Sequence, residues 1–550
     1  MLWTIVRREL LSHLISLRFA VCLVLCTALS AASCYLLAED YGNRLARYNA
    51  DQARSKEAVQ EVKVYALLRP EVHRPPTPLS VFAEGLDRKM GTRAVIAIEE
   101  VPYRLTGGQV VNEFAPVFPI LDFATIVGVV LSLLALLLSY DSISGEKERG
   151  TLRICLANAC PRHQILLGKY LGSFLALGVS LLVTLIVCLL IVSAHPAIAL
   201  GTNLLARTAL IFLAALLALS CFLLLGLWVS ARTQQSFTTL VVLLFVWVLT
   251  VFVLPRTGGY AARQAYKVTD RKTVEHQVSQ LLQEAGDKVQ AYRETLGPRG
   301  FWAAMSGTGE IVNWKLLPAG NPYPVLEYYR KFYAYAAPLY VGYSGRAWDL
   351  RRRREQELAR QQRLAEGFQL LSPAALFVDV ARRIAGTDVY HFRRFMDGLR
   401  RYRRSLIEHL EEKQVFSSYA FTSLYEPNAG EKSFFTHFQA LQSRIMQMAH
   451  GIQPGSEEAK QLFENEEFSQ LAAQYEEENR TLKDRWKAFI QDHPQKSTQI
   501  DLAGMPVFKA PVLALGTVAT AASPILLVLC VYNVLLFLLA HAAFLRCDVR

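Results

Sequence analysis

Six long apolar runs constrain the fold of this chain more than any other feature of its sequence. A helix needs about 20 apolar residues to cross the hydrocarbon core of a bilayer. Each run approaches or exceeds that length, and charged residues, which are costly at mid-bilayer, are almost absent from them. The runs occupy residues 19–38, 119–140, 172–194, 207–230, 237–254 and 523–545. The sequence therefore predicts an all-α membrane protein with six transmembrane helices.

The N-terminal segment, residues 1–18, carries apolar residues at helical spacing, with arginines on its other side. This pattern predicts an amphipathic helix that lies in the cytoplasmic interface. The alternative is a lipoprotein signal that ends at Cys34, after Ala31, Ala32 and Ser33. Segment 1–18 is long for the charged region of a signal and has its own apolar face. We therefore expect 19–38 to be a retained span.

The composition indicates water-facing parts besides the bundle. The 550 residues are 52% hydrophobic and 19% charged, too apolar for an ordinary soluble protein and too charged for a purely membrane-embedded one. Residues 39–118 are predicted to form a polar extracytoplasmic loop. Residues 255–522 contain several amphipathic helical stretches, and Gly386 and Asp388 form a helix stop and a new N-cap. They predict a large helical extracytoplasmic domain.

The orientation follows from basic residues near the span ends, which gather in the short connections on one side. We expect both termini, including the tail 546–550, to be cytoplasmic. The two long polar segments would lie on the other side, because segments of that length cross largely regardless of their charge. The net charge of +12 suits contact with the anionic head groups of the lipid bilayer.

Segment 141–171 is short, charged and held between two spans. Ser142 or Ser144 is expected to cap a short helix, with Glu146 in its first turn. The run SGEKERGTLRICLANACPRHQILLGKYLG resembles the segment after the second span of type-2 ABC exporter permeases. The alternative is an ordinary solvated loop whose charges keep it out of the bilayer.

The resemblance extends to other parts of the chain. LLSPAALFVDVARRIAGTD, at 370–388, and the C-terminal YNVLLFLLAHAAFLRCDVR are similar to a subgroup of these permeases. That subgroup carries a long helical extracytoplasmic insertion between its last two spans. Its members commonly have a tyrosine where this chain has Cys547.

In that family the charged segment forms a coupling helix that docks on a separate ATPase. The resemblance therefore implies a docking surface, with ATP and Mg²⁺ bound by a partner ATPase dimer. It also implies a second permease, either another copy or a related chain. The residues carried over to the docking surface are Ser144, Gly145, Glu146, Lys147, Glu148, Arg149, Gly150, Thr151 and Leu152.

The sequence contains no motif of an enzyme. It has no G-x-x-x-x-G-K-[ST] run to cradle ATP phosphates and no H-E-x-x-H run to bind zinc. Cys155 and Cys160 have no flanking partner pair, which favours plain thiols over a zinc site. We expect a transport subunit that binds no cofactor or metal of its own.

Few polar residues in the spans could serve a cargo. Asp122 is a candidate for the path or its outer gate, although a carboxylate at the membrane surface is the alternative. Spans lined by apolar and small residues suit an apolar or amphiphilic cargo.

Two stretches of residues 255–522 are candidates for a partner surface. The first holds Tyr328, Tyr329 and Tyr333, and the second holds Arg351, Arg352, Arg353 and Arg354. Tyrosines and arginines are frequent at binding and membrane surfaces. Packing against the spans and solvated helix faces are the alternatives. The partner would be periplasmic, which excludes nucleic acid.

Together these features predict the permease subunit of an ABC exporter in a bacterial inner membrane. The alternative is an ATP-driven mechanical transmitter or scaffold that acts on a periplasmic partner and moves no cargo. A receptor lacks an output domain, and a membrane enzyme lacks a catalytic constellation.

Overall fold

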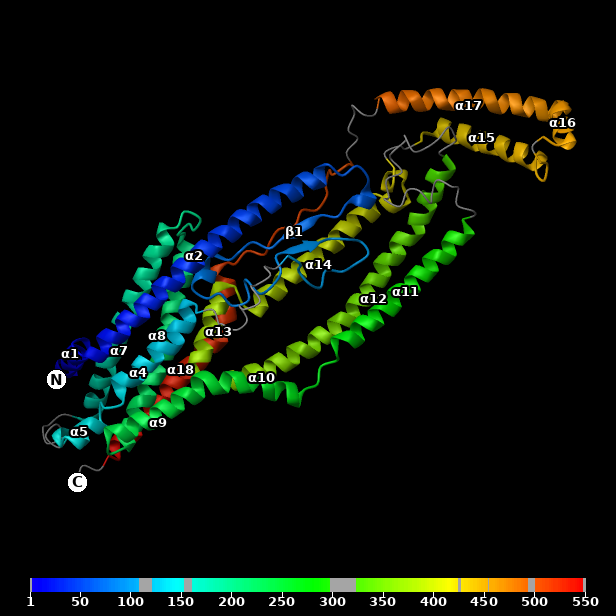
Figure 1. Ribbon diagram of the computed structural model, residues 1–550. Helices are drawn as coiled ribbons and strands as arrows, with labels where there is room; N and C mark the ends of the chain where they lie inside the picture. Colours follow the sequence, from blue (N-terminus) through cyan, green and yellow to red (C-terminus); the bar gives the residue numbers. More distant parts are fainter. Residues whose placement is uncertain are drawn as a thin grey trace.

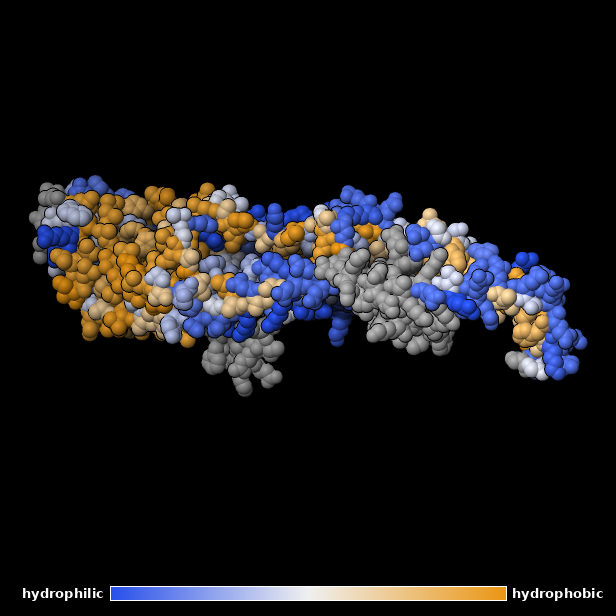
Figure 2. All heavy atoms as spheres, turned by 90° about the horizontal axis from the view of Figure 1, so that it is seen from above, coloured by the Kyte–Doolittle hydropathy of each residue, from blue (hydrophilic) through white to orange (hydrophobic). Residues whose placement is uncertain are grey.

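The computed structural model describes residues 2–107, 121–152, 161–296, 323–423, 427–453, 455–492 and 500–547. The molecule is elongated, with apolar helices bundled at one end and a helical domain that extends away from the bundle (Figure 1). On the face that Figure 2 shows, apolar side chains cover the bundle, and hydrophilic ones cover most of the described part of the extension. This division places the membrane around the bundle.

Six helices within the described residues are long and apolar enough to cross a membrane. The predicted all-α membrane fold with six spans is therefore confirmed. The second span combines α3 (Phe123–Ile126), a wider π-helical turn (Val127–Leu131), α4 (Ser132–Ser139) and α5 (Ser144–Glu148). The others are α2 (Leu17–Gln60), α7 (Arg162–Ala194), α8 (Thr202–Arg232), α9 with α10 (Ser236–Ala265) and α18 (Leu515–Leu545).

The centre of the bundle is a continuous apolar core. α8 packs against α4, α7 and α18, and its Phe222 and Leu223 are fully buried. Gly226 lies directly against Ser139 of α4, which allows the two backbones to approach closely. Asn533 of α18 donates from Nδ2 to the Leu217 carbonyl at 2.9 Å. α8 is therefore the central helix of the bundle.

The N-terminal helix α1 (Leu2–Leu14) lies against α7. Two glycines of α7 make room for it, because a Cβ atom at position 168 or 172 would lie 2.6 Å from an atom of α1. Trp3 and Ile15 remain exposed, at 71% and 82%. α1 is thus a packed part of the bundle as well as a surface helix.

The helix of the first span continues well beyond residue 38, into the segment predicted to be a loop, and ends at Gln60. Beyond the apolar part, Arg44 of this helix binds Asp40 at 2.8 Å and also pairs with buried Asp87. The same segment later forms β1 (Glu71–His73), which pairs antiparallel with β2 (Arg93–Val95). The composition of residues 39–107 indicates a loop, but ion pairs and tertiary contacts give this segment a defined structure.

The helical domain consists of α11 (Arg271–Thr295), α12 (Tyr323–Gln369), α13 (Pro373–Ala385), α14 (Val389–Glu412), α15 (Ala429–Met448), α16 (Glu457–Glu464) and α17 (Glu466–Asp492). α10 (Leu254–Ala265) leads into it. The expected break between α13 and α14 is present: Gly386 is left-handed, at φ +74°, and the Asp388 carboxylate caps α14. α13 returns to the bundle and packs against α8 and α18, while α15 and α17 pair at the far end (Figure 1).

Candidate functional site

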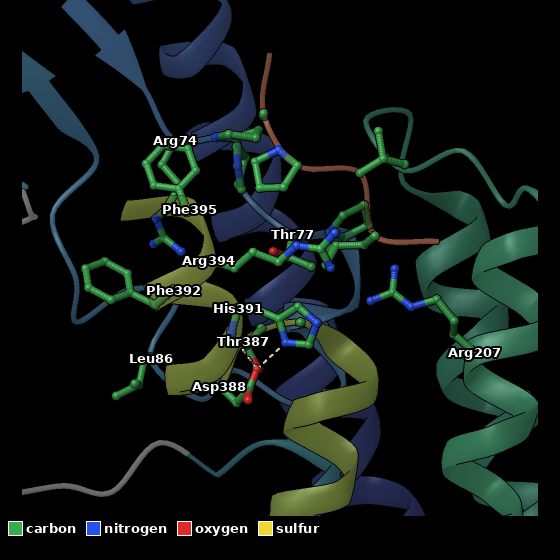
Figure 3. Close-up of a pocket in the computed structure, with 18 of the residues that line it drawn as sticks. Arg74, Thr77, Leu86, Arg207, Thr387, Asp388, His391, Phe392, Arg394 and Phe395 are labelled. Carbon is green, nitrogen blue, oxygen red and sulfur yellow. Dashed lines mark hydrogen bonds and ion pairs between the residues drawn. The ribbon is translucent and has the colours of Figure 1, made fainter. Parts of the chain in front are cut away.

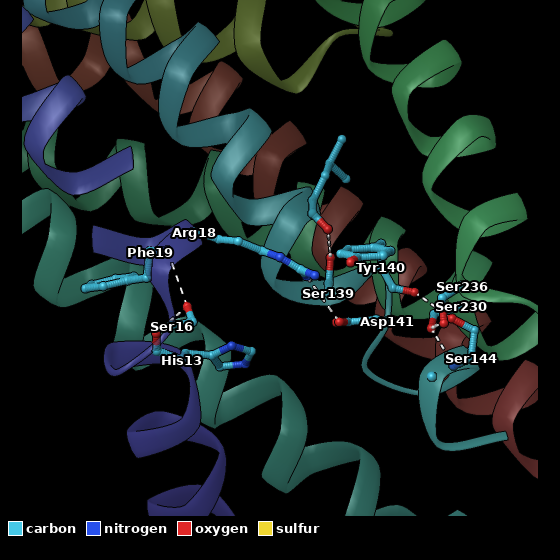
Figure 4. Close-up of polar contacts among 12 residues, drawn as sticks. His13, Ser16, Arg18, Phe19, Ser139, Tyr140, Asp141, Ser144, Ser230 and Ser236 are labelled. Carbon is cyan, nitrogen blue, oxygen red and sulfur yellow. Dashed lines mark hydrogen bonds and ion pairs between the residues drawn. The ribbon is translucent and has the colours of Figure 1, made fainter. Parts of the chain in front are cut away.

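The short helix α5 lies at the end of the bundle that also holds both chain termini (Figure 1). Neither Ser142 nor Ser144 caps it, contrary to expectation. Ser230 of α8 supplies the cap, because its Oγ accepts from the backbone N–H groups of Ile143 at 3.1 Å and Ser144 at 2.9 Å. The Ser144 hydroxyl instead donates to the Tyr140 carbonyl. The start of α5 is therefore fixed to α8 (Figure 4).

Two charged side chains fasten α5 to the connection between α8 and α9. Lys147 Nζ donates to the carbonyls of Ala231 at 2.6 Å and Thr233 at 3.0 Å, at the end of α8. The Glu148 carboxylate accepts from the backbone N–H and the hydroxyl of Ser236, at the start of α9. Each charge has the sign that favours its helix terminus.

Glu146 points inward and joins an ion cluster of three residues. Lys169 Nζ of α7 lies 2.7 Å from Glu146 Oε1 and 2.8 Å from Glu9 Oε1 of α1. The Lys169 side chain is 4% exposed, and both carboxylates are 19% exposed. The cluster ties α5 to α1 and α7, and the sequence motif that contains Lys169 did not indicate these partners.

A further set of polar contacts lies beside this cluster (Figure 4). Arg18, near the start of α2, lies 3.3 Å from Asp141 Oδ2 and covers the Tyr140 ring. Ser16 caps α2 by accepting from the Phe19 backbone N–H, and His13 Nε2 lies 2.9 Å from Ser173 Oγ. The first two helices therefore contact both ends of segment 141–171.

The nine residues predicted as a docking surface fall into three groups by exposure. Glu148, Arg149, Gly150 and Thr151 are exposed. Ser144, Gly145 and Leu152 are buried, while Glu146 and Lys147 are intermediate. We call residues 148–151 the α5 tip. Cys155 and Cys160 lie outside the described residues.

The remainder of the segment secures the α5 tip. Gly150 adopts a left-handed conformation, at φ +71°, that ends the helical turn. Leu152 is 1% exposed and packs in a cluster with Ile143, Leu227 and Phe544. The tip is thus an exposed turn between two anchored points.

Asp122 is buried and acts as the N-cap of α3. Its Oδ1 accepts from the Thr125 backbone N–H at 2.8 Å, and its Oδ2 accepts from the Glu84 backbone N–H at 2.9 Å. Both oxygens of the Asp122 carboxylate therefore accept hydrogen bonds from backbone N–H groups. A role of Asp122 in a cargo path stays a prediction.

The tyrosine stretch packs inside the helical domain. Tyr333 contacts the Phe421 ring and belongs to the apolar core of the domain, and the Tyr328 hydroxyl accepts from Arg293 Nε of α11. Tyr329 stacks on Tyr333. These contacts lie within the helical domain and not against the spans, and a partner surface at these tyrosines stays a prediction.

The four arginines at 351–354 differ in their contacts: two bind neighbouring segments and two are exposed. Arg351 binds Glu100 at 3.1 Å and Glu275 at 2.9 Å, and Arg354 donates to the Thr269 carbonyl. Arg352 and Arg353 are exposed. Within the described residues, no group of three or more His, Cys, Asp and Glu residues is placed to hold a metal ion.

The fold and this site define a class: a multi-pass α-helical membrane protein whose polar helix α5 is fastened at one end of its bundle. Residues 3–319, more than half of the chain, match the model of the ABC-2 family transporter protein. The chain therefore belongs to the ABC-2 family of ABC transporter permeases, as the resemblance implied. Residues 343–439 match a domain of unknown function, DUF3526, which covers most of α12 and all of α13 and α14.

Two curated relatives carry the name probable ABC transporter permease protein NosY. The chain is 44% identical over 64 residues to the one from Stutzerimonas stutzeri, which is 12% of this chain and 23% of the relative. It is 49% identical over 53 residues to the one from Pseudomonas aeruginosa, which is 10% of this chain and 19% of that relative. The similarity thus spans about a fifth of each relative.

Proposed function

We propose that the chain is the membrane subunit of an ABC exporter of a bacterial inner membrane, and that the α5 tip docks on a separate ATPase subunit. The observation that carries this proposal is the attachment of α5. Its tip is exposed, and the side chains of Glu146, Lys147 and Glu148 bind α1, α7, α8 and the start of α9, with Glu148 at the base of the tip. A force applied to the tip would therefore reach four helices of the bundle together.

In this proposal ATP and Mg²⁺ are bound by a dimer of ATPase subunits, each of which contacts one permease chain. Two copies of this chain, or one copy with a related permease, would face each other. Closure of the ATPases on ATP would push on both α5 tips and shift the bundles. The end of the molecule that holds α5 and both termini would be cytoplasmic, as the basic residues near the span ends predict.

The proposed cargo is apolar or amphiphilic. Helix α9 supports this choice, since Phe237 and Phe245 are exposed at 75% and 70%, and only 11% of the apolar window of its span is buried within the chain. That face is available to lipid, to a second permease or to an apolar cargo.

The proposal is tested by charge reversal on the α5 tip. Arg149→Glu leaves every contact between helices described above in place. Among the residues that the structure describes, the Arg149 side chain hydrogen-bonds only to the Gly145 carbonyl of its own segment. We expect this variant to fold and to lose most of the ATPase that copurifies with the tagged wild-type chain. The matched control is Arg7→Glu, an exposed arginine on α1. Undiminished copurification and ATPase activity with Arg149→Glu would refute docking at the tip.

A second candidate is an ATP-driven mechanical transmitter that moves the helical domain and carries no cargo. The continuous 44-residue helix α2 favours this function. It runs from the bundle toward the helical domain and contacts β1 there (Figure 1). Reconstituted vesicles distinguish the two functions. ATP-dependent transfer of a labelled amphiphile supports the exporter. ATP-dependent distance changes between spin labels on α2 and α17, without such transfer, support the transmitter.

A further inference from the structure

A cavity of about 300 Å³ lies where the helical domain meets the bundle (Figure 3). The early part of α8 forms one wall with Asn203 and Arg207. The turn between α13 and α14 and the start of α14 form another. Residues 74–78 and residues 510–513, which lead into α18, complete it.

The cavity has an excess of positive charge. Arg207 is 5% exposed and donates from Nε and Nη2 to the Ile384 carbonyl, at 2.9 and 2.6 Å. Arg394 lines the cavity as well, and neither arginine pairs with a carboxylate in the part of the chain that the structure describes. Arg74 is already paired, at 2.9 Å, with Asp87. A buried guanidinium without an anion is costly, so an anionic ligand would offset that cost.

The one carboxylate among the lining residues, that of Asp388, already caps the N-terminus of α14. Asp388 accepts from the backbone N–H groups of Tyr390 and His391 and pairs with His391 Nδ1. Two arginines therefore face one capping carboxylate, which leaves a net charge of +1 before His391 is counted. The N-terminus of α14, a helix of 24 residues, adds to the positive potential.

His391 supplies an unpartnered polar atom in the cavity. The residue is 6% exposed, and its Nε2 has no hydrogen-bond partner among the described residues. Figure 3 shows its ring and the guanidinium groups of Arg207 and Arg394 directed toward the same space. Buried polar atoms normally have a partner, and a ligand in the cavity would supply one.

Apart from Thr77, Asn203 and Thr387, the rest of the lining is apolar and adjoins the membrane-spanning region. Leu86, Phe392, Phe395 and Leu513 contribute apolar side chains, and Val512 is 78% exposed. The cavity lies beside the first turns of α8 and α18, which are both candidate spans. A ligand with an anionic group and an apolar tail would match both parts of the lining.

We propose that this cavity binds the phosphate group of an anionic phospholipid, with Arg207, Arg394 and the protonated ring of His391 as its ligands. His391 Nδ1 pairs with Asp388, so Nε2 donates to a phosphate oxygen only when both ring nitrogens carry a proton. The bound head group would neutralise the arginines and join α8, α14 and the segment before α18. The same chemistry would also accept free inorganic phosphate, and the experiment separates the two sources. The inference does not depend on ATPase docking at α5.

The experiment measures binding to the purified full chain in neutral detergent. The probes are dihexanoyl-phosphatidylglycerol, dihexanoyl-phosphatidylcholine and inorganic phosphate, each titrated against thermal unfolding. We expect phosphatidylglycerol to raise Tm at the lowest concentration, phosphate to act only at higher concentrations, and phosphatidylcholine to act weakly. Arg394→Gln should weaken the apparent affinity for phosphatidylglycerol about tenfold or more, because a charge-assisted hydrogen bond is lost.

The matched control is Arg393→Gln, the neighbouring exposed arginine, which does not line the cavity. His391→Asn provides a second variant, so the test does not rest on one substitution. Equal effects of phosphatidylglycerol and phosphatidylcholine would overturn the proposal. Unchanged phosphatidylglycerol binding in both variants would also overturn it. If inorganic phosphate bound as tightly as phosphatidylglycerol, the lipid proposal would be overturned, and the ligand would be a free anion.

Discussion

Lys169 Nζ of α7 lies 2.7 Å from Glu146 Oε1 of α5, and this contact joins the predicted docking segment to the bundle. Glu9 of α1 completes the cluster at 2.8 Å. Glu146 is therefore an anchor of α5, whereas Arg149 and Thr151 are exposed on the α5 tip, where we propose that the ATPase docks. Substitutions at Glu146 and Arg149 therefore test different properties.

Lys169→Met should destabilise the protein by about 3 kcal/mol, because it leaves two carboxylates facing each other without their cation. The expected result is a lower Tm in detergent. Adding Glu9→Gln and Glu146→Gln to the same chain should recover part of the loss, since no buried charge then remains unpaired. The matched control is Lys460→Met, which removes an exposed lysine 2.8 Å from Glu457 and should change stability by less than about 1 kcal/mol. Equal effects at both lysines would contradict this account.

Gly172→Ala should separate α1 from α7. A Cβ atom at this position would lie 2.6 Å from Glu9 Cβ and 3.2 Å from the Val6 carbonyl oxygen. Overpacking of this kind costs about 1–3 kcal/mol. The measurements are Tm and the rate of tryptic cleavage after Arg7 and Arg8, which should rise as α1 detaches.

Gly178→Ala is the control for this prediction. It lies on the same helix, and its Cβ would meet only Leu216 Cδ2, at 3.9 Å. It should be neutral or slightly stabilising, because alanine favours helix over glycine. If Gly172→Ala behaved in the same way, the close packing of α1 on α7 would be wrong.

The six spans could be predicted because their signal is local: a run of apolar residues is visible without knowledge of any partner. The helix break at Gly386 was predictable for the same reason, since a left-handed glycine and an Asp388 cap are adjacent in sequence. The inward position of Glu146 was not. Its partner Lys169 is 23 residues away, and Lys169 joins Glu9 across 160 residues.

Helix α12 shows where tertiary contacts override a local signal. Pro338 lies inside α12, which continues through it over 47 residues. The aromatic side chains before this proline pack on α11 and on Phe421, and these contacts offset the lost backbone hydrogen bond. The cavity lined by Arg207 and His391 was equally hidden, because its walls come from four separate parts of the chain.

Glu84 should make stability depend on pH. Its side chain is buried, its Oε1 lies 3.4 Å from Arg88 Nε but has no hydrogen-bond partner among the described residues, and burial raises the pKa of this carboxyl to about 7. Because the folded state binds this proton more tightly than the unfolded state does, stability falls as pH rises from about 4.5 through about 7. Glu84→Gln should remove this loss and exceed the wild type by about 3 kcal/mol at pH 8, with little difference at pH 4. Tm values of both proteins from pH 4 to 8 test this prediction, and parallel curves would contradict it.

Arg403 should be essential to the packing of the helical domain, whereas its neighbour Arg404 should not. The Arg403 guanidinium is 7% exposed and donates to the carbonyls of Ala97 at 2.8 Å and Ile98 at 2.5 Å. It also donates to Ser344 Oγ of α12 at 2.7 Å, so one side chain joins α14, α12 and the segment after β2. Arg403→Met leaves these buried acceptors without a donor and should cost about 3 kcal/mol, while exposed Arg404→Met should cost less than about 0.5 kcal/mol. Thermal unfolding of the two variants, measured side by side, decides the matter: equal Tm values would mean that Arg403 does not hold the domain together.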